Sequence, residues 1–271
     1  MEMIKYVPNK MKNSVYTKET ALFSKEQVEK VYRFHKSMGD KYNKTPLARL
    51  DALAASLGLG GLFVKDESQR GNLKAFKLLG GAYAVANSIC RKLGVSIDEV
   101  NFEYLKSDEV KRKLGDLTFA AASDGNHGKS VAWAAHEFNQ KSIVYMPKGT
   151  VRDRIEAIER FGGTVVVSDD NYDWCVREVN RLAAEKGWEV VLDTASEGDP
   201  QVATWVMQGY ATMGVEAIEQ LGDVVPTHMF LQAGVGSMAA AIAGVFINHY
   251  GDKCPQIYIM EPHQAACSYD S

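Results

Sequence analysis

The chain has 271 residues, of which 46% are hydrophobic and 24% are charged, and its formal net charge is -3 at pH 7. These values are typical of a soluble globular protein with a substantial core, arranged as one large domain or two modest ones. The slightly acidic balance offers no basic surface to a phosphate backbone, which argues against nucleic acid as a partner.

The start of the chain, residues 1–14, is polar and does not have the pattern of a secretory signal. The most apolar stretch, 229–246, contains Gln232 and several glycines, and it favours a strand, a turn and a helix over a membrane span. The four cysteines lack metal-ligand spacing, so we expect reduced thiols in a cytoplasmic protein. A bridge through Cys254 or Cys267 stays open as an alternative.

Helical and strand patterns alternate along the chain. Ser24 followed by Gln27 is a capping box that predicts a helix through about residue 36. Further helices are predicted at 76–93 (ending at Gly94), 127–137, 152–161, 172–186, 200–221 and 237–249. Strands are predicted at 62–64, 118–122, 142–146, 164–167, 189–192, 228–232 and 256–260. This order predicts an α/β fold with parallel sheets, in which ligands bind beyond the carboxyl ends of the strands.

Lys77 opens an apolar helix and is flanked by Phe76, Leu78 and Leu79. Apolar surroundings disfavour the ammonium form of a lysine, and the neutral amine is the form that attacks an aldehyde. The alternative is a surface lysine whose stem covers the core, which fits Lys74 better.

A glycine turn joins the apolar strand at 228–232 to an alanine-rich helix. The glycines permit close approach of a ligand to the backbone, and the helix start offers free N–H groups to a phosphate. The turn is neither a Walker A motif nor a full G-x-G-x-x-G, and a tight turn without a ligand is the alternative.

The loop 123–128 reads Ser-Asp-Gly-Asn-His-Gly between a strand and a helix. Asn126 can donate a hydrogen bond to a phenolate, and backbone N–H groups at the helix start can hold a carboxylate. An ordinary cap by Ser123 or Asp124 is the alternative for the loop, and a structural histidine is the alternative for His127.

In their order, these three motifs resemble the pyridoxal-5′-phosphate (PLP) dependent β-family, fold type II, which includes the serine and threonine dehydratases. The resemblance implies that Lys77 carries PLP as a Schiff base beside Phe76. It implies that Asn126 contacts the cofactor O3′ and that the loop at Ser123 and His127 holds the substrate carboxylate. The phosphate would then be bound by Gly234, Val235, Gly236, Ser237 and Met238.

The chain departs from ordinary dehydratases, which carry a serine two residues before the lysine where this chain has Ala75. The 2,3-diaminopropionate ammonia-lyases of the same family are the closer resemblance. It lies in the segments 76–84, 123–129, 193–198, 204–210 and 232–239. The resemblance implies α,β-elimination of the D and L isomers of 2,3-diaminopropionate to pyruvate and ammonia.

A diamino acid substrate gives Asp124 a physical role. A carboxylate beside the carboxylate-binding loop would repel an ordinary amino acid, whereas a second ammonium offers it an opposite charge. Asp193 follows the strand at 189–192 and should lie at the same rim. Asp124 (for the D isomer) and Asp193, with Lys77 (for the L isomer), would then remove the Cα proton from opposite faces. The alternative for Asp193 is a turn cap with Thr194.

The resemblance also implies two domains, each with a central, mostly parallel sheet flanked by helices. Residues 1–85 and 212–271 would form the large PLP-binding domain and 86–211 the small domain. Enzymes of this family continue beyond this point, so the large domain is expected to be incomplete at its C-terminal end, with sheet edges and helix faces exposed. The residue that faces the pyridine nitrogen has no candidate here, and a cytoplasmic homodimer is a family expectation.

Other functions stay open. A serine or threonine dehydratase would turn over L-serine or L-threonine and leave Asp124 unexplained. A non-catalytic, truncated chain would bind PLP without turnover. A nucleotide-binding module is permitted by the glycine turn, but no acidic ribose partner follows about 20 residues later.

Overall fold

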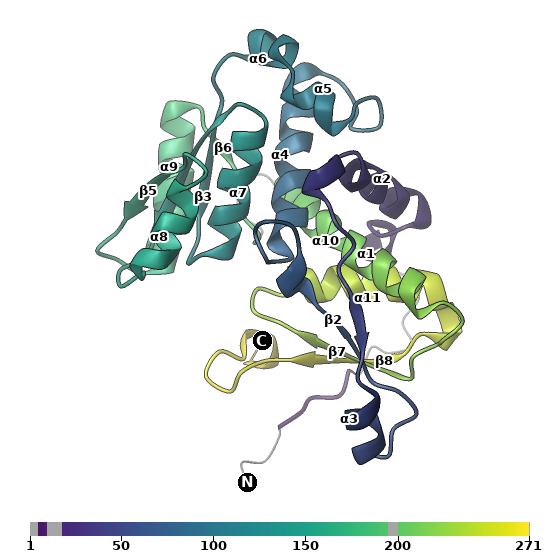
Figure 1. Cartoon of the computed structure of the whole chain (residues 1–271). Helices are drawn as coiled ribbons and strands as arrows, with labels where there is room; N and C mark the ends of the chain where they lie inside the picture. Colours follow the sequence, from purple (N-terminus) through teal and green to yellow (C-terminus); the bar gives the residue numbers. More distant parts are fainter. Residues whose placement is uncertain (1–4, 10–17, 195–199, 271) are drawn as a thin grey trace.

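The computed structural model describes residues 5–9, 18–194 and 200–270. They form an α/β structure in which a four-stranded sheet and a two-stranded sheet lie on either side of long central helices (Figure 1). The predicted α/β fold with parallel sheets is confirmed in both of these sheets. A third sheet, of two strands, is antiparallel.

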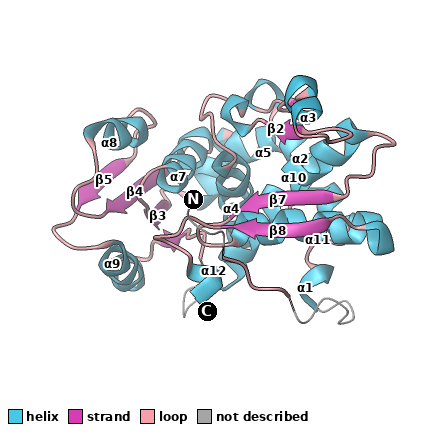
Figure 2. Cartoon of the chain, turned by 90° about the horizontal axis from the view of Figure 1, so that it is seen from below, coloured by secondary structure: helices cyan, strands magenta, loops and turns pink. Residues whose placement is uncertain are grey.

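The larger sheet has the strand order β5-β4-β3-β6, and its neighbouring strands are parallel. One face is covered by α9, whose Cys175 and Val179 pack with Ala120 of β3. The opposite face is covered by α7 and α8, as Figure 2 shows. The elements are β3 (Thr118–Ala122), α7 (Asn126–Glu137), β4 (Lys141–Met146), α8 (Arg152–Glu159), β5 (Thr164–Val167), α9 (Tyr172–Lys186) and β6 (Glu189–Val190).

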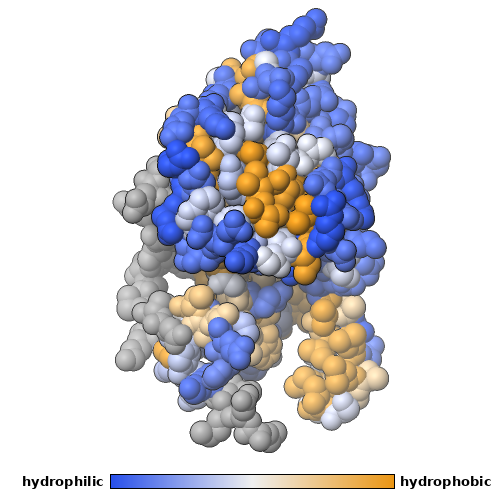
Figure 3. Space-filling model, turned by 90° about the vertical axis from the view of Figure 1, so that its left-hand side faces the viewer, coloured by the Kyte–Doolittle hydropathy of each residue, from blue (hydrophilic) through white to orange (hydrophobic). Residues whose placement is uncertain are grey.

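β5 forms one edge of this sheet, and its last residue, Val167, is 46% exposed. Figure 3 looks at the side of the molecule on which β5 and α8 lie, and an apolar patch is visible there among hydrophilic residues. An unpaired edge strand with apolar side chains is a surface on which a second chain can pair.

The second parallel sheet pairs β7 (His228–Gln232) with β8 (Gln256–Met260) through the crossover helix α11 (Ser237–Tyr250). The stretch that looked most apolar in the sequence is therefore a strand, a turn and a helix. No helix among the described residues is long and apolar enough to cross a membrane. One face of this sheet exposes Phe230, which stacks on Tyr258 with ring centroids 4.9 Å apart.

Two long helices, α4 (Lys77–Leu93) and α10 (Pro200–Leu221), cross at the centre of the molecule. The crossing is close because two glycines meet there. A Cβ atom on Gly209 would lie 2.6 Å from the Leu79 carbonyl oxygen and 2.7 Å from the Gly80 Cα. The predicted boundaries at 86 and 212 fall inside these two continuous helices, and the two-domain division stays a prediction.

The remaining elements pack around this crossing. Ser24 caps α2 as predicted, since its hydroxyl accepts the Gln27 N–H at 3.3 Å. The strand expected at 62–64 is β2, which pairs with β1, a strand that the sequence did not reveal. These elements are α1 (Lys18–Ala21), α2 (Lys25–Lys36), β1 (Leu47–Arg49), α3 (Asp51–Ser56), β2 (Phe63–Lys65), α5 (Phe102–Lys106), α6 (Asp108–Leu114) and α12 (Cys267–Asp270). Short 3-10 turns occur at Gly39–Lys41, Glu67–Gln69 and Gly251–Lys253.

Two predicted elements are too long. The helix expected at 152–161 ends at Glu159, and the strand expected at 189–192 ends at Val190. The Val191 N–H still donates to Ala120 of β3, but the Val191 carbonyl turns to the His127 ring instead of continuing the sheet. The chain leaves the sheet there, and this departure carries Asp193 towards the centre of the molecule.

Candidate active site

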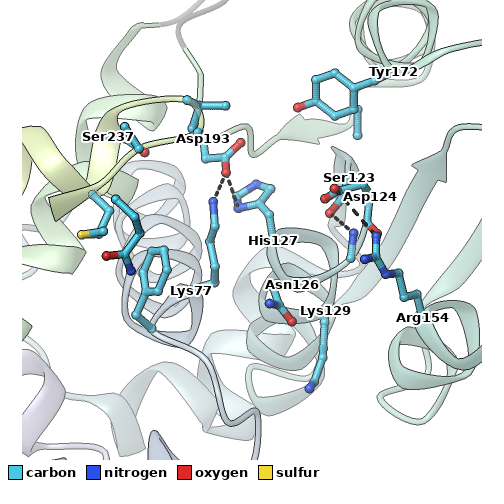
Figure 4. Close-up of a pocket in the computed structure, with 18 of the residues that line it drawn as sticks. Lys77, Ser123, Asp124, Asn126, His127, Lys129, Arg154, Tyr172, Asp193 and Ser237 are labelled. Atoms are coloured by element: carbon cyan, nitrogen blue, oxygen red, sulfur yellow. Dashed lines mark hydrogen bonds and ion pairs between the residues drawn. The ribbon is translucent and has the colours of Figure 1, made fainter. Parts of the chain in front are cut away.

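All the site residues predicted from the sequence line one cavity of about 650 Å³. It lies at the carboxyl ends of β3, β6 and β7, where an α/β fold places its ligands (Figure 4). The start of α4 closes one wall of the cavity. The predicted residues in its lining are Phe76, Lys77, Ser123, Asp124, Asn126, His127, Asp193, Gly234, Val235, Gly236, Ser237 and Met238.

Lys77 is the first residue of α4, and its Nζ forms an ion pair and a hydrogen bond with Asp193 Oδ2. Nζ also lies 5.6 Å from the ring centroid of Phe76 and 5.8 Å from that of Tyr210. The apolar surroundings expected for Lys77 are therefore present on one side only. A carboxylate from a residue 116 positions away faces it on the other side.

His127 is buried in the first turn of α7, and its ring is fixed by the backbone of the departing β6 segment. Nε2 lies 2.8 Å from the Val191 carbonyl oxygen. A carbonyl only accepts, so Nε2 carries the ring proton of the neutral imidazole. Nδ1 is then the acceptor nitrogen. It is buried, has no hydrogen-bond partner among the described residues, and lies 4.0 Å from Asp193 Oδ2.

Burial lowers the pKa of His127, because the low-dielectric interior disfavours the imidazolium more than Asp193 favours it. Burial alone would raise the pKa of Asp193, but nearby positive charge, from His127 when protonated and from Lys77, outweighs it and lowers that pKa. We assign a neutral imidazole and an ionised Asp193, because the Lys77 hydrogen bond and ion pair suffice to hold the carboxylate.

The loop after β3 is folded by Ser123. Its buried hydroxyl accepts the N–H groups of Gly125 at 3.0 Å and Gly128 at 2.9 Å. Ser123 thus has the capping role that was the alternative in the sequence, and its contact with a substrate stays a prediction. Asn126 is exposed and lines the cavity at the first residue of α7, where backbone N–H groups lack intrahelical partners.

Asp124 has a partner that the sequence did not suggest. Arg154, in α8, donates from Nη1 to the Asp124 carbonyl at 2.7 Å and lies 3.8 Å from its carboxylate. The Asp124 side chain is 79% exposed, in contrast to the 7% exposure of Asp193. The two carboxylates therefore reach the cavity from different walls and in different surroundings.

Sequence reasoning also missed Tyr172, the first residue of α9, which lines the cavity. Burial raises the pKa of its phenol, and the negative charges of Asp193 and Asp124 raise it further. A signal was available, since Arg154 and Tyr172 follow β4 and β5 as Asp124 follows β3. Side chains at the starts of helices after neighbouring parallel strands gather at one rim.

The glycine turn between β7 and α11 is open towards the cavity. Gly236 has a φ of 84°, which favours glycine, and precedes the first residue of the 14-residue α11. Apart from chain neighbours, no described residue lies within 4 Å of a Cβ placed on Gly234 or Gly236. Gly236 is the N-cap residue of α11 and has no side chain to cap the first N–H groups of the helix. An anion can therefore bind at the helix start, in the same cavity as the Lys77 amine. PLP has an aldehyde, a phosphate and an aromatic ring. The cavity offers the Lys77 amine for the aldehyde, the glycine turn for the phosphate and space for the ring, so these residues fit PLP.

Comparison with known proteins agrees with this geometry. Residues 39–271 match the family described as pyridoxal-phosphate dependent enzyme. The diaminopropionate ammonia-lyase of Escherichia coli K12 is 44% identical over 96% of this chain, and that of Salmonella typhimurium LT2 is 43% identical over the whole of this chain. The chain spans 65% of the first relative and 68% of the second.

A solved structure of the holo diaminopropionate ammonia-lyase from Escherichia coli superposes with a TM-score of 0.91 at 44% identity, covering 98% of this chain and 66% of that one. The L-threonine dehydratase of Haemophilus influenzae is more distant, with 27% identity over 82% of this chain and 37% of its own length. In the segment 193–198, which resembled the ammonia-lyases, residues 195–198 lie outside the described residues. The match over 39–271, together with Lys77 and the glycine cradle in one cavity, shows that the chain belongs to the family of pyridoxal-phosphate dependent enzymes.

Proposed function

We propose that this protein catalyses the α,β-elimination of 2,3-diaminopropionate, in its D and L isomers, to pyruvate and ammonia. The observation that carries the proposal is the pair of carboxylates, Asp193 and Asp124, on two walls of a cavity that also holds Lys77. The 44% identity to a diaminopropionate ammonia-lyase supports the substrate.

In this proposal Lys77 would hold PLP covalently, and Asn126 would donate a hydrogen bond to its phenolic oxygen. The backbone of the glycine turn at residues 234–238 would hold the phosphate, and Phe76, which lines the same cavity, would contact the cofactor. Bound PLP supplies an electron sink for the charge left on the substrate when Cα loses its proton. The N–H groups at the start of α7, with Ser123 and His127 around them, orient the substrate carboxylate.

The two carboxylates act as bases on opposite faces of Cα. Asp193, together with Lys77, takes the Cα proton of the L isomer, and Asp124 takes that of the D isomer. The β-nitrogen then leaves as ammonia. The three-carbon enamine that is released hydrolyses in water to pyruvate and a second ammonia. As further parts of the proposal, the enzyme is a cytoplasmic homodimer, with a large domain of 1–85 and 212–271 and a small domain of 86–211.

The proposal is tested by measuring ammonia and pyruvate released by the purified protein with added PLP. DL-2,3-diaminopropionate is compared with L-serine, and Lys77→Ala is compared with Lys74→Asn. Lys74 is an exposed lysine outside the cavity lining, and asparagine tolerates its positive φ of 53°. We expect turnover of the diamino acid that Lys77→Ala abolishes and Lys74→Asn retains.

Two results would contradict the proposal in different ways. Preference for L-serine would show a dehydratase. A Lys77-dependent absorbance of bound PLP without any product would show a cofactor site that does not turn over. The second result is relevant because the chain spans 65% of its Escherichia coli relative.

A further inference from the structure

His127 offers the cavity a buried acceptor that no donor in the described part of the chain satisfies. Its Nδ1 is the unprotonated nitrogen, because the Val191 carbonyl binds the Nε2 proton. Asp193 Oδ2, which lies 4.0 Å from Nδ1, is also an acceptor. Two buried acceptors that face each other need a donor between them, since an unsatisfied buried acceptor is costly.

The donor that fits has at least two hydrogens on one atom. A nitrogen about 2.9 Å from both acceptors would donate to each of them. An ammonium has three hydrogens and also carries the charge that Asp193 attracts, whereas a hydroxyl has one hydrogen and no charge. Lys77 donates to Asp193 Oδ2 in the structure, so His127 Nδ1 is the acceptor of the two that stays without a partner among the described residues.

We propose that His127 Nδ1, together with Asp193, binds the β-ammonium of the substrate and is the specificity determinant for an amine leaving group. This inference rests on the proposed function and moves ammonium recognition away from Asp124, whose carboxylate already lies beside Arg154. Figure 4 shows the His127 ring and Asp193 turned towards one another beside Lys77.

The chemistry balances without a further reactant. The Cα proton passes to a carboxylate, the Cα–Cβ double bond forms, and the Cβ–N bond breaks with its electron pair on nitrogen. An ammonium leaves in this way as neutral ammonia. Acceptors around the β-nitrogen keep it protonated until the bond breaks. A neutral Nδ1 has no proton to give to a departing hydroxide, so the same site is unsuited to serine.

Two substitutions separate the two ring nitrogens. His127→Gln places an amide N–H near the position of Nε2, where it can still donate to Val191, and leaves no acceptor at the position of Nδ1. His127→Asn places an amide oxygen near the position of Nδ1 and gives up the Val191 bond. A role in folding alone would make His127→Asn the more damaging variant. The proposed role makes His127→Gln the more damaging one for the diamino substrate.

The readout is the ratio of kcat/KM for 2,3-diaminopropionate to that for 3-chloroalanine, measured with PLP. Chloride leaves as an anion and needs no acceptor, but the Cα proton is removed in the same way. Since a hydrogen bond to a charged group is at stake, we expect this ratio to fall roughly tenfold or more in His127→Gln. It should fall less in His127→Asn.

A second readout does not depend on turnover. With histidine labelled by ¹⁵N in the ring, the PLP-loaded protein should show a His127 signal with Nε2 protonated and Nδ1 bare, identified by its loss in His127→Gln. The opposite tautomer would overturn the proposal. Equal losses of kcat/KM for the two substrates in His127→Gln would also overturn the proposal. If the wild type turns over 2,3-diaminopropionate in that case, the proposed function would still stand. A wild type that prefers L-serine would instead overturn the proposed function itself, and the ammonium site with it.

Discussion

Asp193 and Asp124 are both carboxylates that follow strands of one sheet, yet their surroundings differ. Asp193 is 7% exposed and pairs with Lys77, whereas the Asp124 side chain is 79% exposed and lies 3.8 Å from Arg154. Asp193, which is buried beside Lys77, and Asp124, which is exposed, therefore approach a molecule bound in the cavity from different directions. Their removal should therefore affect the two isomers of the substrate unequally.

Asp193→Asn should lower kcat/KM for L-2,3-diaminopropionate by roughly a hundredfold or more, because a positioned general base contributes about 10² to 10⁴ in rate. Asp124→Asn should do the same for the D isomer. Asparagine preserves the shape of each side chain but cannot take a proton. The measurement is steady-state kinetics with each pure isomer. Equal losses for both isomers in both variants would show that neither carboxylate is a face-specific base.

At the scale of elements, the crossing of α4 and α10 determines where Lys77 lies. Gly209 and Gly80 bring the two backbones into contact, so that Lys77 at the start of α4 reaches the cavity wall. Tyr210, next to Gly209, is fully buried and packs against Phe76 with centroids 5.1 Å apart. A change at the crossing would alter both the stability of the protein and the position of the lysine.

Gly209→Ala should lower the free energy of unfolding by about 1–3 kcal/mol, because the added methyl would overlap Leu79 and Gly80 and separate the helices. Gly60→Ala is the matched control, since no described residue beyond its chain neighbours lies within 4 Å of its added Cβ and its φ lies outside the left-handed region. Chemical denaturation of the two variants measures the difference. Equal stability of the two would show that the crossing can relax at no cost.

At the scale of the whole molecule, His35 ties three helices together. It lies on α2, its Nε2 donates to the Leu79 carbonyl of α4 at 3.0 Å, and its Nδ1 accepts from the Thr212 hydroxyl of α10 at 2.7 Å. Both helical partners belong to the central crossing. Burial is the main reason that the pKa of His35 is lowered from 6.5 to about 3, so the folded protein keeps this ring neutral.

This burial predicts a loss of stability in acid. Below pH 6.5 the unfolded chain binds a proton at this ring, and the folded protein does not until about pH 3. The free energy of unfolding should therefore fall with decreasing pH, by up to about 1.4 kcal/mol per unit from this group, between these two values.

The measurement is urea denaturation at pH 7.5, 6 and 5 for the wild type and His35→Gln. Glutamine can still donate to Leu79 and does not titrate, so the difference in pH slope between the two proteins isolates His35. Parallel pH profiles would show that the ring is protonated in the folded protein as readily as in the unfolded one.

Much of the fold could be predicted because its signals are local. The capping box at Ser24, the glycine after α4 and the regular alternation from β3 to β8 each depend on neighbouring residues. β1 was missed, since a three-residue strand has too few positions to show a period, although its antiparallel partner β2 was predicted. The loop after β3 and the glycine turn were recognised as ligand-binding segments. Each places glycine or polar residues between a strand and a helix, where they contribute little to a packed core.

The sequence by itself determined the strands and helices of the two parallel sheets, their order, and which motif residues stand at the carboxyl ends of strands. These follow from side-chain periodicity and backbone preference, which act over a few residues. Only the tertiary structure decided that Asp193 pairs with Lys77, that Arg154 lies beside Asp124, and that the Val191 carbonyl selects the His127 tautomer. Those contacts join residues far apart in the chain, and they depend on how the helices and sheets pack.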